Sequence, residues 1–350
     1  MRPVVRRAIP LLLKGAFVGA ALLFLARGVA WVEVARTLQS ANVFLLLGVV
    51  AINGGMMVLK AGRLRLLLRN IPRFSSCFLA KVTTSAINNV LPLRGGDMAR
   101  LWMLERHARV TKSAAAAVAV VEVLFEMISL GVVALVGAVL IHQQRWVIGT
   151  ALALLGVATL PIWLVLRKGD TRPRHADDPI RKSGPIGRLH GFAERIEPGL
   201  VALRRRLVVA AVVAMSLGIW LLEIAMVVLC ARAIQLPIGP ALATIILLGI
   251  NLAIAIPSMP ASAGTFEGGA SLVLVLSGIA KGPAVAFALL YHAVQVVPVT
   301  IAGLGVVSRV GLTLNKLPTF PQGSNSGAAA SGVARSRVLS PRTRRWKSTP

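Results

Sequence analysis

Acidic residues and cysteines are scarce in this sequence, and both shortages narrow what the protein can be. The 350 residues include 12 Asp and Glu and two cysteines, against 39 Lys and Arg. Because Cys77 and Cys230 lie far apart in apolar surroundings, a disulfide framework and a zinc site with repeated cysteine spacing are both excluded. The five histidines show no HExxH or other ligand spacing, so we expect no metal.

Motifs of soluble-enzyme chemistry are also missing. No P-loop, GxGxxG motif or Ser/His/Asp order stands at a strand-to-helix junction. The sequence therefore predicts neither a cofactor nor a catalytic site, and we expect a protein that is not an enzyme.

Charged residues make up only 15% of the chain, whereas 56% of the residues are hydrophobic and the mean hydropathy is +0.77. This balance is far from that of a soluble globular domain and predicts an all-α, polytopic integral membrane protein. The net charge of +27 could indicate nucleic acid as a partner. The apolar runs favour instead a basic surface that faces the cytoplasm and anionic lipids.

Apolar runs near 20 residues, the length that crosses a bilayer core of roughly 30 Å, define the expected spans. These spans are residues 9–26, 43–61, 113–141, 146–166, 207–230 and 283–308. The start of the chain has a basic and then an apolar stretch without a small-residue cleavage site, which indicates an uncleaved first span. Residues 27–42 should form an amphipathic connector.

Two further apolar segments are interrupted by polar residues, prolines and glycines. Residues 74–91 contain Asn88 and Asn89, end at Pro92 and have basic flanks on both sides, which favours a re-entrant hairpin from the cytoplasm. Residues 241–280 are broken by the stretch PSMPASAGTFEGG. This second break predicts either an opposed re-entrant hairpin or two short crossings, and the charge pattern fits both.

If the second break is re-entrant, the chain has six spans and two opposed hairpins, and the positive charges fit this arrangement with both termini in the cytoplasm. The Lys and Arg residues expected on the outer side are Arg27, Arg36, Arg145, Arg232 and Lys281. Residues 1–310 would form one polytopic domain that includes a basic cytoplasmic loop at 167–206. Residues 311–350, rich in Ser, Gly and Pro, should be a disordered basic tail in the cytoplasm.

The two breaks share a design. Each has an apolar half-helix, then proline and glycine, and then an acid near the start of the next helix, Asp97 in the first break and Glu267 in the second. Opposed broken helices of this kind can form a site at the membrane midplane. We therefore predict a pseudo-inverted repeat.

The first break, NNVLPLRGGDMAR, carries residues suited to an anion. Gly95 and Gly96 would let the backbone turn, and a helix beginning near Met98 would present unpaired amides. Arg94 and Arg100 add charges suited to bidentate contact with phosphate. These features predict a cradle for a lipid headgroup.

Asp97 and Asn89 complete the candidate cradle. Asp97 can instead cap the helix that follows and pair with Arg100 one turn on, while Arg94 reaches lipid phosphate at the interface. The capping and binding roles are compatible. Asn89 precedes the break and is a candidate headgroup contact.

Glu122 and Glu126 lie four residues apart and share one face of an expected span. Two acids inside a span are costly unless they pair with cations or bind a proton, which favours a functional role. The candidate partners are Arg63, Arg94 and Arg100. A purely structural ion pair is the alternative.

The remaining polar residues of the spans carry weaker signals. Glu223 stands alone in its span, and Glu267, after Gly264, would either cap a helix at Thr265 or meet the substrate. A short polar face on the last span is more typical of interhelical hydrogen bonds than of a site. It consists of Tyr291, His292 and Gln295.

The motif NNVLPLRGGDMARLWML, the acid-bearing span, PSMPASAGTFEGG and YHAVQVVP together resemble the flippase-like transmembrane domain family. This family is typified by the membrane half of lysylphosphatidylglycerol synthase, the multiple peptide resistance factor. The likeness covers about residues 8–310. It implies a protein of the bacterial inner membrane that moves a lipid or lipid-linked amphiphile between leaflets.

The resemblance also implies site residues. The family's polar motif falls on Pro92, Arg94, Gly96, Asp97 and Arg100, its acidic span on Glu122 and Glu126, and its second motif on Gly264 and Glu267. The family often has arginine after the first acid of that span, where this chain has Val123. No folded region of acetyltransferase size follows Ser308, so synthase activity is not expected.

The predicted function is movement of an anionic or phosphate-bearing lipid, or lipid-linked amphiphile, across the bilayer. Two other classes fit the sequence. One is a membrane scaffold that assists a lipid- or glycan-modifying enzyme, and the other is an intramembrane lipid transferase. Loss of lipid translocation on removing the charge of Arg94 or Glu267 would distinguish the transporter from the scaffold.

Overall fold

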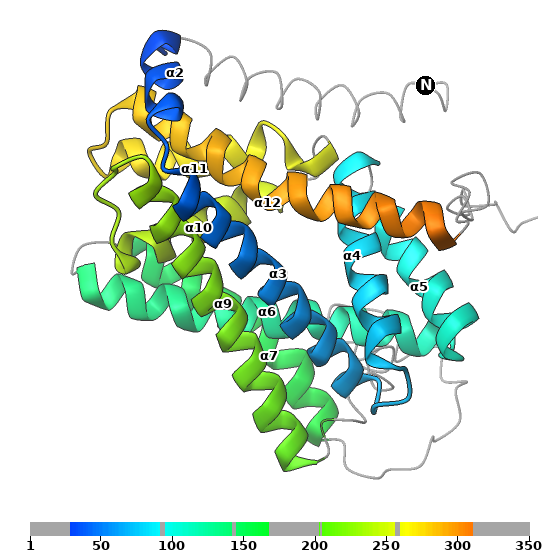
Figure 1. The fold of residues 1–350 in the computed structure, drawn as a ribbon. Helices are drawn as coiled ribbons and strands as arrows, with labels where there is room; N and C mark the ends of the chain where they lie inside the picture. The colour runs from blue at the N-terminus through cyan, green and yellow to red at the C-terminus, as the bar shows by residue number, and fades with distance from the viewer. Residues whose placement is uncertain are drawn as a thin grey trace, which may run out of the picture.

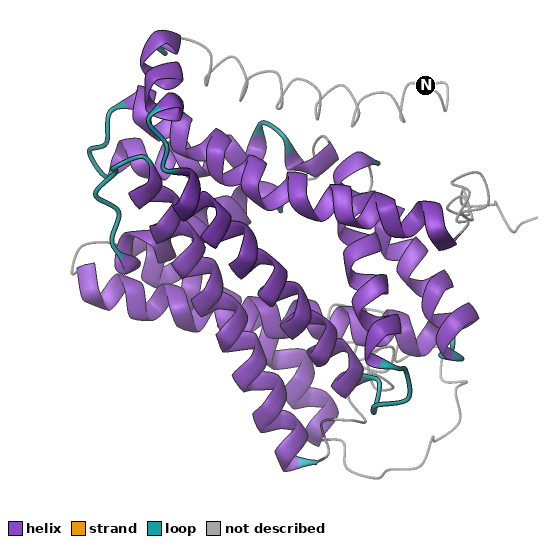
Figure 2. Ribbon diagram, viewed as in Figure 1, coloured by secondary structure: helices purple, strands orange, loops and turns teal. Residues whose placement is uncertain are grey.

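The computed structural model describes residues 29–91, 95–141, 145–167, 203, 205–255 and 260–310. Within these ranges the regular structure is helical and contains no strand (Figure 2). The expected first span at 9–26, most of the loop at 167–206 and the tail at 311–350 lie outside them. So do Pro92, Arg94 and Pro257 of the two breaks.

The described part of the chain contains a series of helices. In chain order they are α2 Trp31–Gln39, α3 Val43–Leu67, α4 Phe74–Val90, α5 Gly95–Ala108, α6 Lys112–Ile141, α7 Arg145–Arg167, α9 Arg206–Ala233, α10 Pro240–Ile254, the 3-10 turn η4 Pro260–Ser262, α11 Thr265–Leu276 and α12 Lys281–Val310. Helix α2 lies within the predicted amphipathic connector at 27–42.

Four of the described helices are long and apolar enough to cross a membrane. They are α3, α6, α9 and α12, each with at least 25 residues in the apolar stretch. At a rise of about 1.5 Å per residue, such a helix exceeds the roughly 30 Å of a bilayer core. These four correspond to predicted spans, and α7 forms where another was expected. The chain is a multi-pass α-helical membrane protein.

The end of α3 corrects one boundary. The sequence suggested a span that stops near Ala61, with Arg63 among the charges that flank it on the cytoplasmic side. Instead, α3 continues to Leu67, and the Arg63 side chain is fully buried inside the protein. An arginine can lie there because carboxylates on α6 pair with it.

Each break separates two short helices that pack against one another. Helix α4 has 17 residues and packs on α5, which has 14, while α10 has 15 residues and packs on α11, which has 12 (Figure 1). By the same rise per residue, α11 is only about 18 Å long. Helix–break–helix hairpins are therefore present at both predicted positions.

The long helices run beside one another and enclose two apolar cores. Helix α3 packs along α9, α6 along α7, and α12 contacts both hairpins through α4 and α11 (Figure 1). One core joins α9, α10, α11 and α12, and the other lies around α4, α6 and the end of α3.

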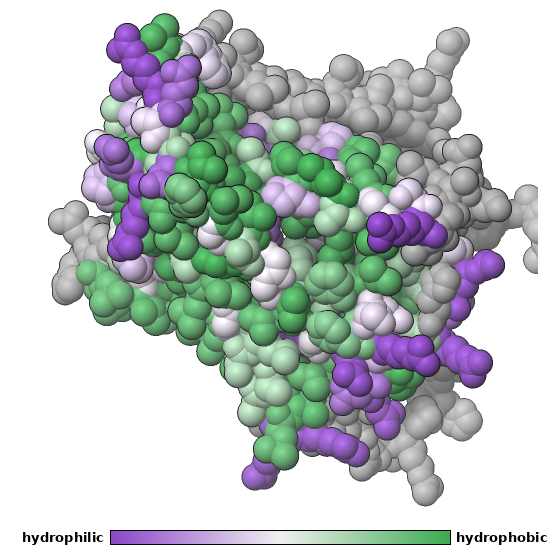
Figure 3. Space-filling view, viewed as in Figure 1, coloured by the Kyte–Doolittle hydropathy of each residue, from purple (hydrophilic) through white to green (hydrophobic). Residues whose placement is uncertain are grey.

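Large apolar side chains also cover the outside. Phe44 and Leu207 are more than four-fifths exposed, and Figure 3 shows a nearly continuous apolar surface over α3 and α9 with polar residues gathered at the ends of the helices. Extended apolar surface of this kind is rare on soluble monomers and suits contact with lipid tails.

Candidate functional site

Glu122 is the centre of a buried ion cluster. Its carboxylate lies 2.7 Å from Nη1 of Arg100, and Nζ of Lys81 lies 2.8 Å from each of its two oxygens. Glu122 and Arg100 expose 2% and 5% of their surface. Three helices contribute, since Lys81 is on α4, Arg100 on α5 and Glu122 on α6. Such charges are tolerable at this depth because each has a partner of opposite sign.

Arg63 extends the cluster to the next turn of α6. Its Nη2 pairs with Glu126, its Nε lies 3.9 Å from Glu122, and its Nη1 donates to Ser216 of α9 at 3.1 Å. The predicted partners Arg63 and Arg100 are thus both confirmed. Val123, which replaces the family's arginine, is 45% exposed.

Several buried donors in this region have no acceptor among the described residues. They are Nε of Arg63, Nε of Arg100 and the indole Nε1 of Trp220. Most buried donors in folded proteins are satisfied, so an orphaned donor needs a physical reason. Water or an anionic ligand would satisfy all three.

A cavity of about 140 Å³ lies beside the cluster. Its polar lining comes from α3, α6, α9, α10 and α12, in the order Lys60, Glu126, Glu223, Asn251, Tyr291 and Gln295. Trp220 and Phe266 form part of its apolar wall. Its apolar lining residues belong to the core that joins α9, α10, α11 and α12.

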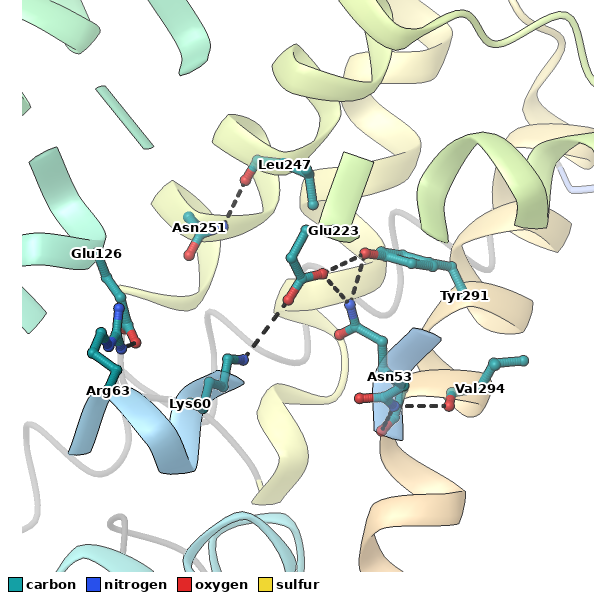
Figure 4. Close-up of polar contacts among 10 residues, drawn as sticks. Asn53, Lys60, Arg63, Glu126, Glu223, Leu247, Asn251, Tyr291 and Val294 are labelled. Carbon is teal, nitrogen blue, oxygen red and sulfur yellow. Dashed lines mark hydrogen bonds and ion pairs between the residues drawn. The ribbon is translucent and has the colours of Figure 1, made fainter. Parts of the chain in front are cut away.

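Glu223 organises the polar side of the cavity. Its carboxylate accepts hydrogen bonds from Tyr291 Oη and Gln295 Nε2, both at 2.9 Å, and lies 3.9 Å from Nζ of Lys60 (Figure 4). Nearby, Asn53 donates to the backbone oxygens of Val294 and Gln295. Glu223 is the single acid of α9, as the sequence indicates, and α12 and α3 supply three partners for it from distant parts of the sequence.

The first break differs from its predicted geometry. Helix α5 begins at Gly95 and not near Met98, so Gly95 and Gly96 are helical and do not form the turn. Gly96 instead permits contact between helices, since a Cβ there would lie 2.1 Å from the carbonyl oxygen of Thr84 on α4. The first helical amides are also less open than expected, because Gly96 donates to Oδ1 of Asn88 at 2.8 Å.

Asn89 and Asp97 take positions around this packed hairpin. Asn89 donates to Oγ1 of Thr300 at 2.8 Å and so ties α4 to α12. Asp97 lies in the first turn of α5, where a carboxylate interacts favourably with the helix dipole. Its role as a cap stays a prediction.

At the second break, the side chain of Glu267 caps the N-terminus of α11. Gly264 precedes α11 with φ of 84°, a conformation that favours glycine, and donates its amide to Oε2 of Glu267 at 2.7 Å. The other oxygen of Glu267 lies 2.7 Å from Nδ1 of His292. The capping prediction for Glu267 is confirmed, and His292 was not recognised from the sequence as its partner.

The structure brings some predicted site residues together and separates others. Arg100, Glu122 and Glu126 share the ion cluster, whereas Gly264 and Glu267 contact one another and His292. The sequence argument missed the roles of Lys60 and Lys81. Both are lysines within apolar helices. The free-energy cost of burying an unpaired lysine there was the signal that could have identified them.

The family model of the lysylphosphatidylglycerol synthase TM region matches residues 11–303 of the chain. The chain belongs to this family. A comparison with curated proteins finds no match.

Membership in the lysylphosphatidylglycerol synthase TM family confirms the resemblance based on the polar motifs. It links the protein to membrane lipids. The match begins before α2 and ends within α12, so it includes the ion cluster, the cavity and both breaks.

Proposed function

We propose that this protein moves an anionic or phosphate-bearing lipid, or a lipid-linked amphiphile, between the two leaflets of a bacterial inner membrane. Its family membership and multi-pass architecture support a role with membrane lipids. The observation that carries the proposal is the charged cavity inside an apolar helical body. Charges at such depth are expensive, and a transport path for a polar headgroup is a reason to keep them.

The net charge of the ion cluster and the cavity lining together favours an anion as the ligand. The cluster and the cavity lining contain the cations Lys60, Arg63, Lys81 and Arg100 and the carboxylates Glu122, Glu126 and Glu223. Four cations face three carboxylates, which leaves one positive charge. A phosphodiester carries one negative charge, so it would neutralise the network, and the orphaned Nε donors would then have acceptors.

The size of the cavity restricts what enters it. About 140 Å³ is similar to the roughly 150 Å³ cavity that holds one benzene molecule in another protein. Only a phosphate-sized part of a lipid fits, while the acyl chains would remain against the apolar outer surface. This division suits translocation, because the headgroup is the part that cannot cross the hydrocarbon core alone.

The two hairpins provide the route on this proposal. Helices of 12 to 17 residues are too short to cross upright, so we place the hairpins as opposed re-entrant elements that enter from the two sides. Arg94 and Arg100 would receive the phosphate, and the acids would replace part of its hydration. Both termini and the loop at 167–206 would face the cytoplasm and its anionic lipids.

The proposal involves no covalent chemistry, metal, cofactor or nucleic acid. A pure transporter moves an unmodified lipid, whereas a transferase would yield a new one. Mass spectrometry of the lipids after incubation with the purified protein separates these two classes.

The direct test is translocation in vesicles. The full chain is reconstituted in phosphatidylglycerol and phosphatidylethanolamine, and the exposure of fluorescent phosphatidylglycerol to an external quencher is followed with time. We expect Lys60→Gln and Arg100→Gln to slow translocation about tenfold or more, the factor that corresponds to about 1.4 kcal/mol. Lys60 is the safer variant for folding, since 23% of its side chain is exposed.

The matched control is Lys112→Gln, which removes a lysine that pairs with Glu105 at the surface. This variant should retain the wild-type rate. Translocation that persists unchanged in both cavity variants would contradict the proposal and favour a membrane scaffold.

A further inference from the structure

The two ring nitrogens of His292 each face a hydrogen-bond acceptor. Nδ1 lies 2.7 Å from Oε1 of Glu267, and Nε2 lies 3.0 Å from the backbone oxygen of Ala261. A carbonyl oxygen only accepts, so Nε2 must carry a proton, and a second proton must lie between Nδ1 and the carboxylate. The arrangement therefore holds one proton more than a neutral imidazole beside an ionised carboxylate.

We propose that Glu267 and His292 form a proton-binding site, and that loss of its proton releases the turn Pro260–Ser262 from α12. Both residues are 8% exposed. A connection to lipid movement rests on the function proposed above. In that case the proton would control which conformation of the second break is present.

Loss of the proton leaves the His292 ring with too few N–H donors for both of its contacts. A neutral imidazole has one N–H, which serves either Glu267 or Ala261 but not both. A bond to an ionised carboxylate is stronger than one to a neutral carbonyl, so the N–H stays at Nδ1 and the Ala261 contact opens. The released proton passes to water, and the pair changes from neutral to a single negative charge.

The turn is a segment whose backbone favours such a release. Ala261 and Ser262 have φ of 54° and 59°, in the left-handed region that residues with a Cβ adopt at a cost. The hydroxyl of Thr265 donates to the Ser262 backbone oxygen at 2.9 Å. The His292 contact holds the other side of the turn.

The turn also packs against α4, which carries Lys81. Lys81 is a direct partner of Glu122 in the ion cluster. The turn and the ion cluster therefore both contact α4.

The charged side chains on the cavity side of His292 pair with one another and not with its ring. Glu223 of α9 bonds the neighbouring Tyr291 and lies 3.9 Å from Lys60 of α3. Phe266 of α11 lines the cavity and stacks on the His292 ring with centroids 4.3 Å apart. These contacts leave Glu267 as the carboxylate that meets the ring.

Charged groups on the other helices that pack against α12 lie elsewhere. Lys81 of α4 is engaged by Glu122. Glu33 of α2 lies against Gly282, ten residues and about 15 Å along α12 from His292. Neither takes the place of Glu267.

The first experiment measures access to the turn in the full chain. Ser262→Cys is introduced, and its reaction with a water-soluble maleimide is followed in phosphatidylglycerol and phosphatidylethanolamine vesicles. The native cysteines, Cys77 and Cys230, are buried and give a low background. We expect the labelling rate, divided by that of a fully exposed cysteine at the same pH, to rise about tenfold between about pH 5.5 and 8.5. A rate that does not change with pH beyond the intrinsic thiol effect on an exposed cysteine would overturn the proposal.

Two variants should shift this rate in opposite directions. Glu267→Gln keeps an oxygen for the Gly264 amide and presents an N–H to Nδ1, so both contacts persist without a titrating proton and labelling stays slow at every pH. His292→Leu removes both contacts, so labelling is fast at every pH. A merely structural contact would give slow labelling at every pH in the wild type and in Glu267→Gln alike. The comparison of the wild type with Glu267→Gln decides the question even if His292→Leu does not fold.

Nitrogen NMR of histidine-labelled protein provides a readout independent of lipid movement. The His292 signal is assigned by its absence in His292→Gln, and we expect it to report two protonated nitrogens at low pH and one at high pH. One neutral tautomer throughout would overturn the proton site. If the site titrates but no lipid moves in vesicles, the proposed function fails and the proton site stands. Lipid movement with a turn that never opens would reject the proton site alone.

Discussion

The two helical hairpins differ in the carboxylates that their charged residues meet. In the first, α4 and α5 present Lys81 and Arg100 to a carboxylate on a third helix, and the charges form a network. In the second, Glu267 caps its own helix and meets a single histidine. The first hairpin therefore depends on tertiary contacts for its electrostatics, whereas the second is largely satisfied locally. Two breaks of similar sequence design therefore make different contacts. The first takes part in an ion cluster of several helices, and the second has a single carboxylate–histidine pair.

The largest difference should appear when the carboxylate that each hairpin meets is neutralised, Glu122 of α6 for the first and Glu267 for the second. Glu122→Gln leaves three buried cations without their central carboxylate, which should lower the free energy of unfolding by about 3–5 kcal/mol. Glu267→Gln retains its cap and should cost about 1 kcal/mol or less. Thermal unfolding in detergent, followed by a dye that reacts with the newly exposed Cys77 and Cys230, measures both. Equal losses would remove the distinction between the hairpins.

The close contact of the first hairpin gives the next effect. Gly96→Ala places a Cβ 2.1 Å from the Thr84 carbonyl oxygen and forces α4 and α5 apart, at about 1–3 kcal/mol. The neighbouring Gly95→Ala is the matched control, since its Cβ would lie 3.5 Å from Leu91 in ordinary contact. The same unfolding assay should show little change for the control. A destabilised control would mean that the first turn of α5 itself requires glycine.

In the second hairpin the glycine requirement is conformational. Gly264→Ala must adopt φ of 84°, which should cost about 1–2 kcal/mol. Gly268→Ala is its control, because nothing lies within 4 Å of its Cβ and alanine favours the helix by about 1 kcal/mol. Opposite signs of these two changes in melting temperature would support the geometry of the cap.

The smallest expected effect concerns the contact between α4 and α12. Asn89→Ala removes a hydrogen bond to Thr300 and should cost about 0.6 kcal/mol, the average for such bonds in another membrane protein. Translocation measured in the same preparation tests the separate prediction that Asn89 contacts the headgroup. A rate equal to that of wild type would assign Asn89 to packing alone.

The sequence predicted the helical elements because their signals are local. The apolar lengths of α3, α6, α9 and α12 and the two interruptions by glycine and proline place the elements without knowledge of their neighbours. The capping role of Glu267 was also visible, since Gly264 stands three residues before it. The start of α5 was missed because Gly95 and Gly96 were interpreted as a turn. Their helical conformation depends on packing against α4.

Partners far apart in sequence could not be predicted in full. Glu122 offered several arginines as candidates, and only the structure added Lys81; Glu223 meets Tyr291 and Lys60 across three helices. The sequence by itself determined that this is a multi-pass helical membrane protein with two broken hairpins, because apolar length and breaks are properties of short segments. The tertiary structure alone decided which charges pair, where the cavity lies and that His292 faces two acceptors. Those features depend on distances between helices, and no periodicity along one chain segment encodes such distances.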